Sequence, residues 1–149
     1  DVVVGELQGL TGERDKLRGV ILSGPSKDIL NQYGNDYDFD WSVQDGVFET
    51  IGKDEAFNDV TTVSSQFGML GSPSITELGA DVRILLNPSI LPNRRIKIES
   101  SAPQLALGNL YFRDIKKTLG EGFYKVQKVI HTGDTHGNDW YSDITGRAL

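Results

Sequence analysis

Residues 38–51 read DFDWSVQDGVFETI, and they contain the clearest local signal in the chain. The first half alternates apolar and polar residues, and its apolar side chains fall on one face: Phe39, Trp41 and Val43. Asp45-Gly46 is a favoured dipeptide for a two-residue type I′ turn, because both positions need a positive φ. The stretch therefore predicts a β-hairpin whose second strand is residues 47–51.

The turn also predicts how the two strands pair. A two-residue loop places Val43 opposite Phe48. It places Trp41 opposite Thr50, so the apolar pairs share one face of the hairpin. We expect this face to cover a neighbouring helix.

A short helix is predicted just before the hairpin. Residues 23–26, Ser-Gly-Pro-Ser, have the form of a helix start, with a small polar cap and a proline in the first turn. One apolar face follows, made by Ile29, Leu30 and Tyr33. Gly34 suits a left-handed helix stop. Helix and hairpin together predict a small domain, residues 25–58, with a boundary in the polar segment 53–59.

Short strands separated by turn residues dominate the rest of the sequence. The β-rich runs are residues 2–7, 17–22, 60–65, 81–86, 94–99, 123–131 and 140–145. Residues 101–122 fit neither the helical nor the strand period, and we expect a long connection there. The predicted fold class is mainly β (α+β).

Composition excludes several classes of protein. The 149 residues contain no cysteine, so disulfides, thiol nucleophiles, thiolate zinc sites and iron–sulfur clusters are ruled out. No apolar run approaches the roughly 20 residues that span a bilayer. A net charge of −6 disfavours a surface that grips nucleic-acid phosphates. Because the chain starts at Asp1 rather than methionine, we expect a fragment or a processed product.

Residues 131–139, HTGDTHGND, hold both histidines of the chain. His131 and His136 with Asp134 and Asp139 could ligate a divalent metal, but the spacing matches no known metal motif. Hydrogen bonds from Asp134 and Asn138 to backbone amides explain the composition better. We therefore predict a structural turn, with no metal and no cofactor.

An acidic run beside aromatic residues raises the question of glycan chemistry. Asp36, Asp38 and Asp40 lie next to Tyr37 and Trp41, and glycosidase clefts use paired carboxylates. Alternate acids also describe the solvent face of a half-buried strand, which is the interpretation we favour. Two alternatives stay open: a cell-wall hydrolase using Asp38 and Asp40, and a glycan-binding module stacking sugars on Tyr37, Trp41 and Trp140.

Other catalytic patterns are absent from the sequence. There is no Gly-x-Ser-x-Gly elbow, Walker motif or dinucleotide glycine fingerprint. The basic clusters are short and lack interleaved aromatics on the same face: Arg94-Arg95 with Lys97, and Lys116-Lys117. They predict solvated faces or subunit contacts rather than nucleic-acid binding. We predict no catalytic residue.

Three stretches resemble the baseplate hub proteins of contractile-tailed bacteriophages, including Mu-like and late-control-protein-D-like members, and related tailocin proteins. The first is QFGMLGSPSITELG at residues 66–79, leading into VRILLNP at 82–88. The second, GFYKVQKVIHTGDTHGNDWY at residues 122–141, is similar to the closing hairpin of that family. The third, around Ile29 to Tyr33 and the WSVQDG of residues 41–46, is similar to its small middle domain.

The resemblance implies a structural virion protein rather than an enzyme. Hub subunits join the tail tube to the puncturing spike as homotrimers with two tube-like β-barrel domains per chain, which adapts threefold to sixfold symmetry. Residues 1–24 would then end one barrel, and residues 59–149 would form the second, an antiparallel tube-like β-barrel. DNA passes through the lumen without specific binding, and acidic side chains there would keep it off the wall. The family's chains are about twice as long, so the resemblance implies that most of a first barrel would precede residue 1.

Overall fold

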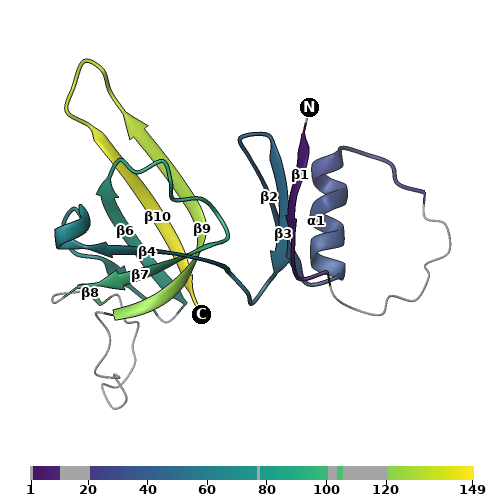
Figure 1. The fold of residues 1–149 in the computed structure, drawn as a ribbon, viewed down its shortest axis with the longest axis horizontal. Coiled ribbons are helices and arrows are strands. Elements are labelled where there is room, and N and C mark those ends of the chain that lie inside the picture. Colours follow the sequence, from purple (N-terminus) through teal and green to yellow (C-terminus); the bar gives the residue numbers. More distant parts are fainter. Residues whose placement is uncertain (1, 11–20, 77, 101–103, 106–120) are drawn as a thin grey trace, which may run out of the picture. The chain divides into compact units, whose positions relative to one another are not determined.

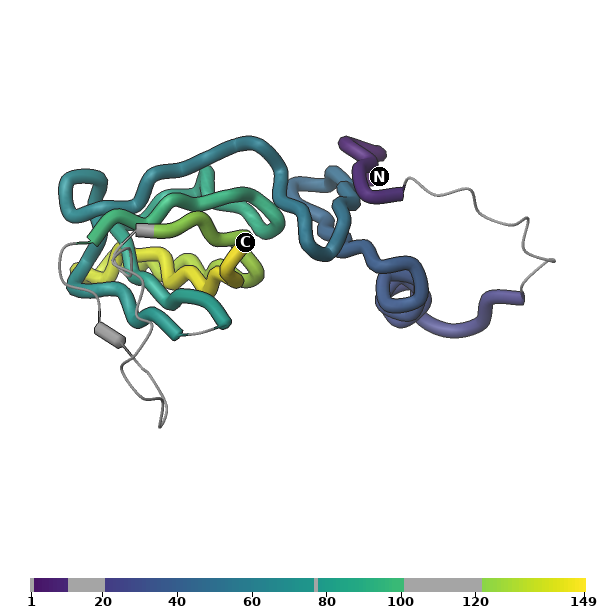
Figure 2. The backbone as a smooth tube through the Cα atoms, turned by 90° about the horizontal axis from the view of Figure 1, so that it is seen from below, coloured from purple at the N-terminus to yellow at the C-terminus, as the bar shows by residue number. Residues whose placement is uncertain are grey.

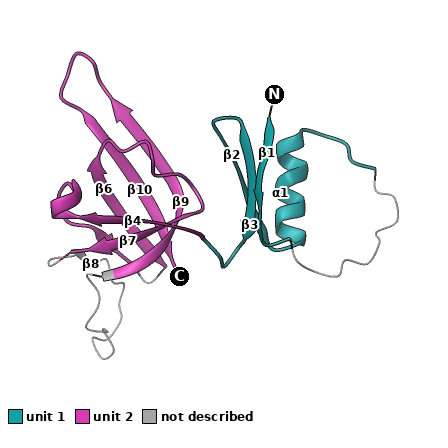
Figure 3. Cartoon of the chain, in the orientation of Figure 1, with its two compact units in different colours: residues 1–56 teal, residues 57–149 magenta. Residues whose placement is uncertain are grey.

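In the computed structural model, the described residues are 2–10, 21–76, 78–100, 104–105 and 121–149. The chain divides into two compact units, Asp1–Ala56 and Phe57–Leu149 (Figure 3). Both are mainly β, and the first also holds the helix α1.

Unit 1 is a three-stranded sheet with one helix. Its elements are β1 (Val3–Leu7), α1 (Ser26–Asp36), β2 (Phe39–Gln44) and β3 (Val47–Gly52), and the strand order is β1-β3-β2. The hairpin prediction is confirmed, because Val43 pairs with Phe48 and Trp41 with Thr50. The positive φ angles of Asp45 and Gly46, 50° and 79°, fit the type I′ turn.

Helix α1 exists where the sequence predicts it, but its two ends differ from the prediction. Its N-cap is Pro25, which makes no side-chain cap hydrogen bond, so the expected polar cap is wrong. Gly34 is buried inside the helix and does not stop it. A Cβ at Gly34 would lie 2.7 Å from the carbonyl oxygen of Phe39, so this glycine lets the helix approach β2 closely. Figure 2 shows α1 almost along its axis.

Unit 2 is one mixed sheet (Figure 1). Its elements are β4 (Phe57–Ser64), η1 (Ser65–Phe67), β5 (Ser74–Ile75), β6 (Gly79–Leu85), β7 (Arg94–Glu99), β8 (Gln104–Leu105), β9 (Glu121–Gly133) and β10 (Trp140–Ala148). The strand order is β4-β7-β9-β10-β6-β5, with the two-residue β8 beside β5. The predicted strands 60–65, 81–86, 94–99, 123–131 and 140–145 all lie within or close to these elements.

One face of the unit 2 sheet supplies the core. The alternating apolar residues predicted for two strands are buried: Val82 and Ile84 on β6, and Ile96 and Ile98 on β7. Val126 of β9 and Ile144 of β10 join the same cluster. Met69 enters it from the loop after η1, through an isolated bridge to Ile84.

The predicted antiparallel barrel is wrong. Strand β4 pairs with β7 in parallel, and β5 pairs with β8 in parallel, so the sheet is mixed. Within the described residues, neither sheet closes on itself. Alternation along a strand reports only which face is buried, whereas closure depends on pairing between distant strands, which alternation does not encode.

Some sequence-based predictions fall elsewhere. The strand predicted at 17–22 and the connection at 101–122 lie mostly outside the described residues, as do Lys116 and Lys117. Strand β1, within the residues 1–24 that we expect to end a preceding barrel, pairs in parallel with β3 of unit 1.

Candidate functional site

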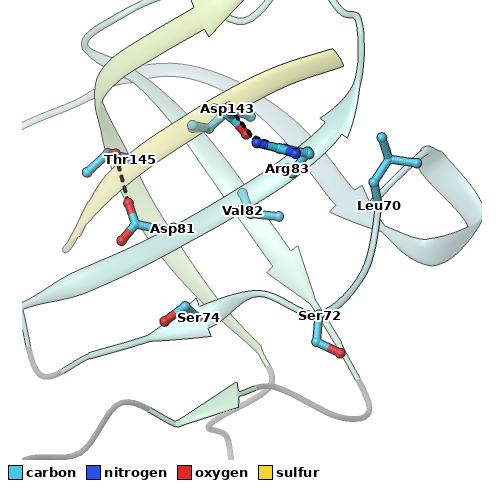
Figure 4. Close-up of a pocket in the computed structure, with 9 residues that line it drawn as sticks. Leu70, Ser72, Ser74, Asp81, Val82, Arg83, Asp143 and Thr145 are labelled. Carbon is cyan, nitrogen blue, oxygen red and sulfur yellow. Dashed lines mark hydrogen bonds and ion pairs between the residues drawn. The ribbon is translucent and has the colours of Figure 1, made fainter. Parts of the chain in front are cut away.

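A hollow of about 280 Å³ lies on unit 2, beside β6 and β10 (Figure 4). The loop before β5 forms its other wall. Its lining comes from three segments: Leu70, Ser72 and Ser74; Asp81, Val82 and Arg83; and Asp143, Ile144 and Thr145. This hollow gathers more charged and hydroxyl groups than a second hollow beside α1.

Arg83 and Asp143 form the charged pair of this hollow. Arg83 donates from Nε to Oδ1 of Asp143 at 2.7 Å and from an Nη atom to Oδ2 at 3.1 Å. The hydrogen bond to Asp143 raises the pKa of the Arg83 guanidinium. The same guanidinium lies over the ring of Tyr141, 4.1 Å from its centroid.

Asp81 and Thr145 form a second polar pair across the same two strands. Thr145 Oγ1 donates to Asp81 Oδ1 at 2.8 Å. No described cation forms an ion pair with Asp81, so its carboxylate can still accept a donor from outside. With Ser72 and Ser74 nearby, the hollow can hydrogen-bond a polar or cationic group. It contains no imidazole or thiol among its lining residues.

The predicted structural turn between β9 and β10 is partly confirmed. Asp134 Oδ1 accepts a hydrogen bond from the backbone N–H of His136 at 2.8 Å, as an Asx turn requires. The backbone N–H of Asp134 donates to the carbonyl of Asp139 at 3.0 Å and closes the loop. Among the described residues, no three His, Asp or Glu side chains gather as metal ligands. The absence of metal dependence stays a prediction.

No local sequence pattern predicts the contact between the buried hydroxyl of Ser142 and the exposed imidazole of His131. Ser142 Oγ lies 2.8 Å from Nδ1 of His131, its cross-strand partner. Ser142 Oγ also accepts the backbone N–H of Asn87 at 3.1 Å. Because Ser142 is fully buried, its hydroxyl ties β10 to its neighbours and does not face a substrate. Only the register of β9 and β10 reveals this pair.

The proposed run of carboxylates is not on one face. Asp36 ends α1, Asp38 lies in a turn with a φ of 54°, and Asp40 lies in β2. Asp38 is 3.7 Å from Nζ of Lys53. The strand begins one residue later than expected because Asp38 adopts a left-handed conformation, which breaks the predicted alternation.

The aromatic candidates for sugar stacking differ in exposure. Trp41 is half-buried, donates from Nε1 to Asn31 Oδ1 at 3.2 Å, and stacks on Phe48. Tyr37 packs against Tyr33 and lines a second hollow of about 320 Å³ beside α1. Trp140 is 45% exposed. It lies at the very start of β10, against Gly133, where the core has already ended.

The basic residues of β7, Arg94, Arg95 and Lys97, have different neighbours. Arg94 pairs with Asp59 at 3.1 Å and lies over the ring of Phe57. Lys97 forms an ion pair with Glu99. Arg95 pairs across strands with Lys125, and Arg147 is the next residue in that row. Lys125 is 1% exposed, whereas Arg94, Arg95 and Lys97 are each partly exposed. A subunit contact through this cluster stays a prediction.

The sequence matches no protein-family model and no curated protein. No helix within the described ranges is both long and apolar enough to cross a bilayer.

Proposed function

We propose that this chain is a structural subunit of a contractile phage tail or tailocin, at the central baseplate hub. The observation that carries the proposal is the placement of the two most specific resemblance stretches. Residues 66–88 contain β6, and residues 122–141 contain most of β9 and the start of β10. These stretches are far apart in the chain, yet β10 pairs with both β6 and β9, so they form one continuous surface.

The chemistry of the described residues favours assembly over catalysis. Ser142 is buried, and the three carboxylates of residues 36–40 lie on α1, in a turn and on β2. Strand β4 is a long edge strand with an exposed Val60, and sheet edges of this kind pair readily with other chains. The proposal therefore assigns no catalytic residue, metal or cofactor.

Within this proposal the full-length protein is a homotrimer that contacts the tail tube and the spike. It is made in the bacterial cytoplasm and works in the virion, where DNA passes through it during ejection. The net charge of −6 supports a conduit that does not hold DNA, because acidic walls repel phosphates. A lumen lined mainly by lysine and arginine in the assembled tail would contradict this part.

The proposal is tested on purified contractile tails of the producing bacterium. Quantitative mass spectrometry should find the chain at three copies per tail, and electron microscopy of the full-length protein should show threefold rings. Absence of the chain from purified tails would overturn the proposal. Peptidoglycan turnover by the purified protein that is lost in a variant combining Asp38→Asn and Asp40→Asn would favour the hydrolase instead.

A glycan-binding module is a second candidate because Trp140 is 45% exposed. Acrylamide quenching separates the two tryptophans when each is replaced in turn by phenylalanine. Trp140 should be quenched more strongly than Trp41 in either case, but soluble cell-wall glycans should protect Trp140 only if it stacks on sugar. No protection at saturating glycan concentrations would remove this candidate.

A further inference from the structure

The outer face of three neighbouring strands carries a regular grid of side chains, and a twofold contact through it is separate from the threefold contacts of the hub proposal. Three cross-strand rows define it, and we call it the outer grid: Asp81, Thr145 and Lys128; Arg83, Asp143 and Ile130; Leu85, Tyr141 and Thr132. Figure 4 shows two of these cross-strand pairs: Asp81 with Thr145, and Arg83 with Asp143. Asp81 and Arg83 belong to β6, and their partners belong to β10. The alternate residues Val82, Ile84 and Ile144 point to the core, so the grid is the opposite face.

The outer grid is rich in exposed apolar surface for a sheet face. Leu85 is 55% exposed, Ile130 is 47% exposed, and the adjoining Leu70 is 39% exposed. The guanidinium of Arg83, on the same face, lies over the ring of Tyr141. Exposed aliphatic side chains around a tyrosine and an arginine are typical of the centre of a protein–protein interface.

The charges of the grid are arranged in a self-complementary way. β10 is the central column, β6 carries Asp81 on one side, and β9 carries Lys128 on the other side of the same row. Both side chains are exposed. A twofold axis parallel to β10 exchanges the two outer columns, so Asp81 faces the partner's Lys128 and Lys128 faces the partner's Asp81. One surface then supplies both halves of two ion pairs.

We propose that the outer grid is an isologous interface with a second copy of this chain. Two such faces pack with nearly aligned strands about 10 Å apart. Leu85 then faces the partner's Thr132, and Tyr141 lies at the axis. Asp143 also lies near the axis in both copies, but Arg83 of the same chain neutralises each carboxylate through two hydrogen bonds. A second copy fits better than an unrelated protein, because Asp81 and Lys128 lie in the same row on opposite sides of β10. The twofold axis therefore brings each of them opposite the other residue of the partner.

Sedimentation equilibrium with charge reversals tests this interface. The wild-type chain should reach twice its mass of 16.4 kDa as concentration rises. Lys128→Asp and Asp81→Lys should each weaken the dimer about tenfold, because each creates two like-charge contacts. The combined variant should restore most of the affinity. Lys27→Asp, at an exposed position of α1 in unit 1, is the matched control and should change nothing.

Cross-linking provides a second measurement that does not depend on charge. The chain has no cysteine, so Thr145→Cys introduces a single thiol next to the proposed axis. A short bismaleimide should link two such chains covalently, whereas chains carrying Lys27→Cys should not be cross-linked. A wild-type chain that stays monomeric at all concentrations, or a double charge reversal that fails to restore dimers, overturns the proposal. A threefold mass unaffected by Lys128→Asp overturns it while leaving the hub assignment standing.

Discussion

The chain contains two hairpins, β2–β3 in unit 1 and β9–β10 in unit 2, and they obtain their register in different ways. In β2–β3 the turn residues Asp45 and Gly46 have positive φ, and the pairing continues without interruption from the turn to Gly52. In β9–β10 the loop is longer, and the register shifts between Thr145 and Gly146. β7 and β6 flank that hairpin on both sides. A tight turn fixes register locally, whereas a long loop leaves it to neighbouring strands.

Core truncation should separate the two hairpins most strongly. Ile144→Ala on β10 should lower the free energy of unfolding of unit 2 by about 2–5 kcal/mol, because Ile144 is 1% exposed and leaves a cavity. Val43→Ala on β2 is the matched control. Val43 is 41% exposed, so its loss should cost about 0.5 kcal/mol. Urea denaturation followed by Trp140 fluorescence for unit 2 and Trp41 fluorescence for unit 1 measures both; equal costs would contradict the comparison.

The next largest effect is expected where α1 meets the local hairpin. Gly34→Ala should destabilise unit 1 by about 1–3 kcal/mol, because the new Cβ would meet the carbonyl of Phe39 and outweigh the better helix propensity of alanine. Gln32→Ala, on the exposed part of the same helix, is the control. Thermal unfolding followed by Trp41 fluorescence should show a lower Tm only for Gly34→Ala. A raised Tm would mean that the helix shifts freely.

The turn of β2–β3 provides a smaller, purely local test. Gly46→Ala should cost about 1 kcal/mol, because alanine at a φ of 79° is strained. Asp45→Asn should be nearly neutral, since asparagine favours the same conformation. Urea midpoints of unit 1 measure both variants. If Gly46→Ala cost nothing, the turn would not be what fixes this register.

The smallest expected effect is on the stability of unit 2 at alkaline pH, and it comes from Tyr124 of β9. Burial raises the pKa of the Tyr124 phenol, so the native state holds its proton more tightly than the unfolded state. The resulting stability is fully present below about pH 10, the ordinary pKa of tyrosine, and is lost as pH rises through the native pKa. Tyr124→Phe should therefore flatten the alkaline loss of unit 2 stability relative to wild type. Parallel pH profiles for both proteins would contradict this.

Much of the local structure was predictable from sequence. The hairpin register, the helix position and the burial of Ile96 and Ile98 follow from alternation and turn chemistry within short windows. The ends of α1 could not be predicted from sequence. Gly34 lies inside the helix rather than at its end, because it allows the close approach to Phe39, and that approach depends on how α1 packs. The candidate hollow was also missed, because it joins residues 70–74, 81–83 and 143–145, which no local pattern connects.

The sequence by itself determined a mainly β chain with one helix, a type I′ hairpin at Asp45-Gly46 and the inward faces of β6 and β7. These features depend on neighbours one to four residues apart, where steric and hydrogen-bonding preferences act directly. Only the tertiary structure decided that β4 runs parallel to β7, that the sheet stays open, and that Asp81 and Lys128 share a row. Pairing between distant strands depends on how whole faces are buried together, and that information is spread over the chain.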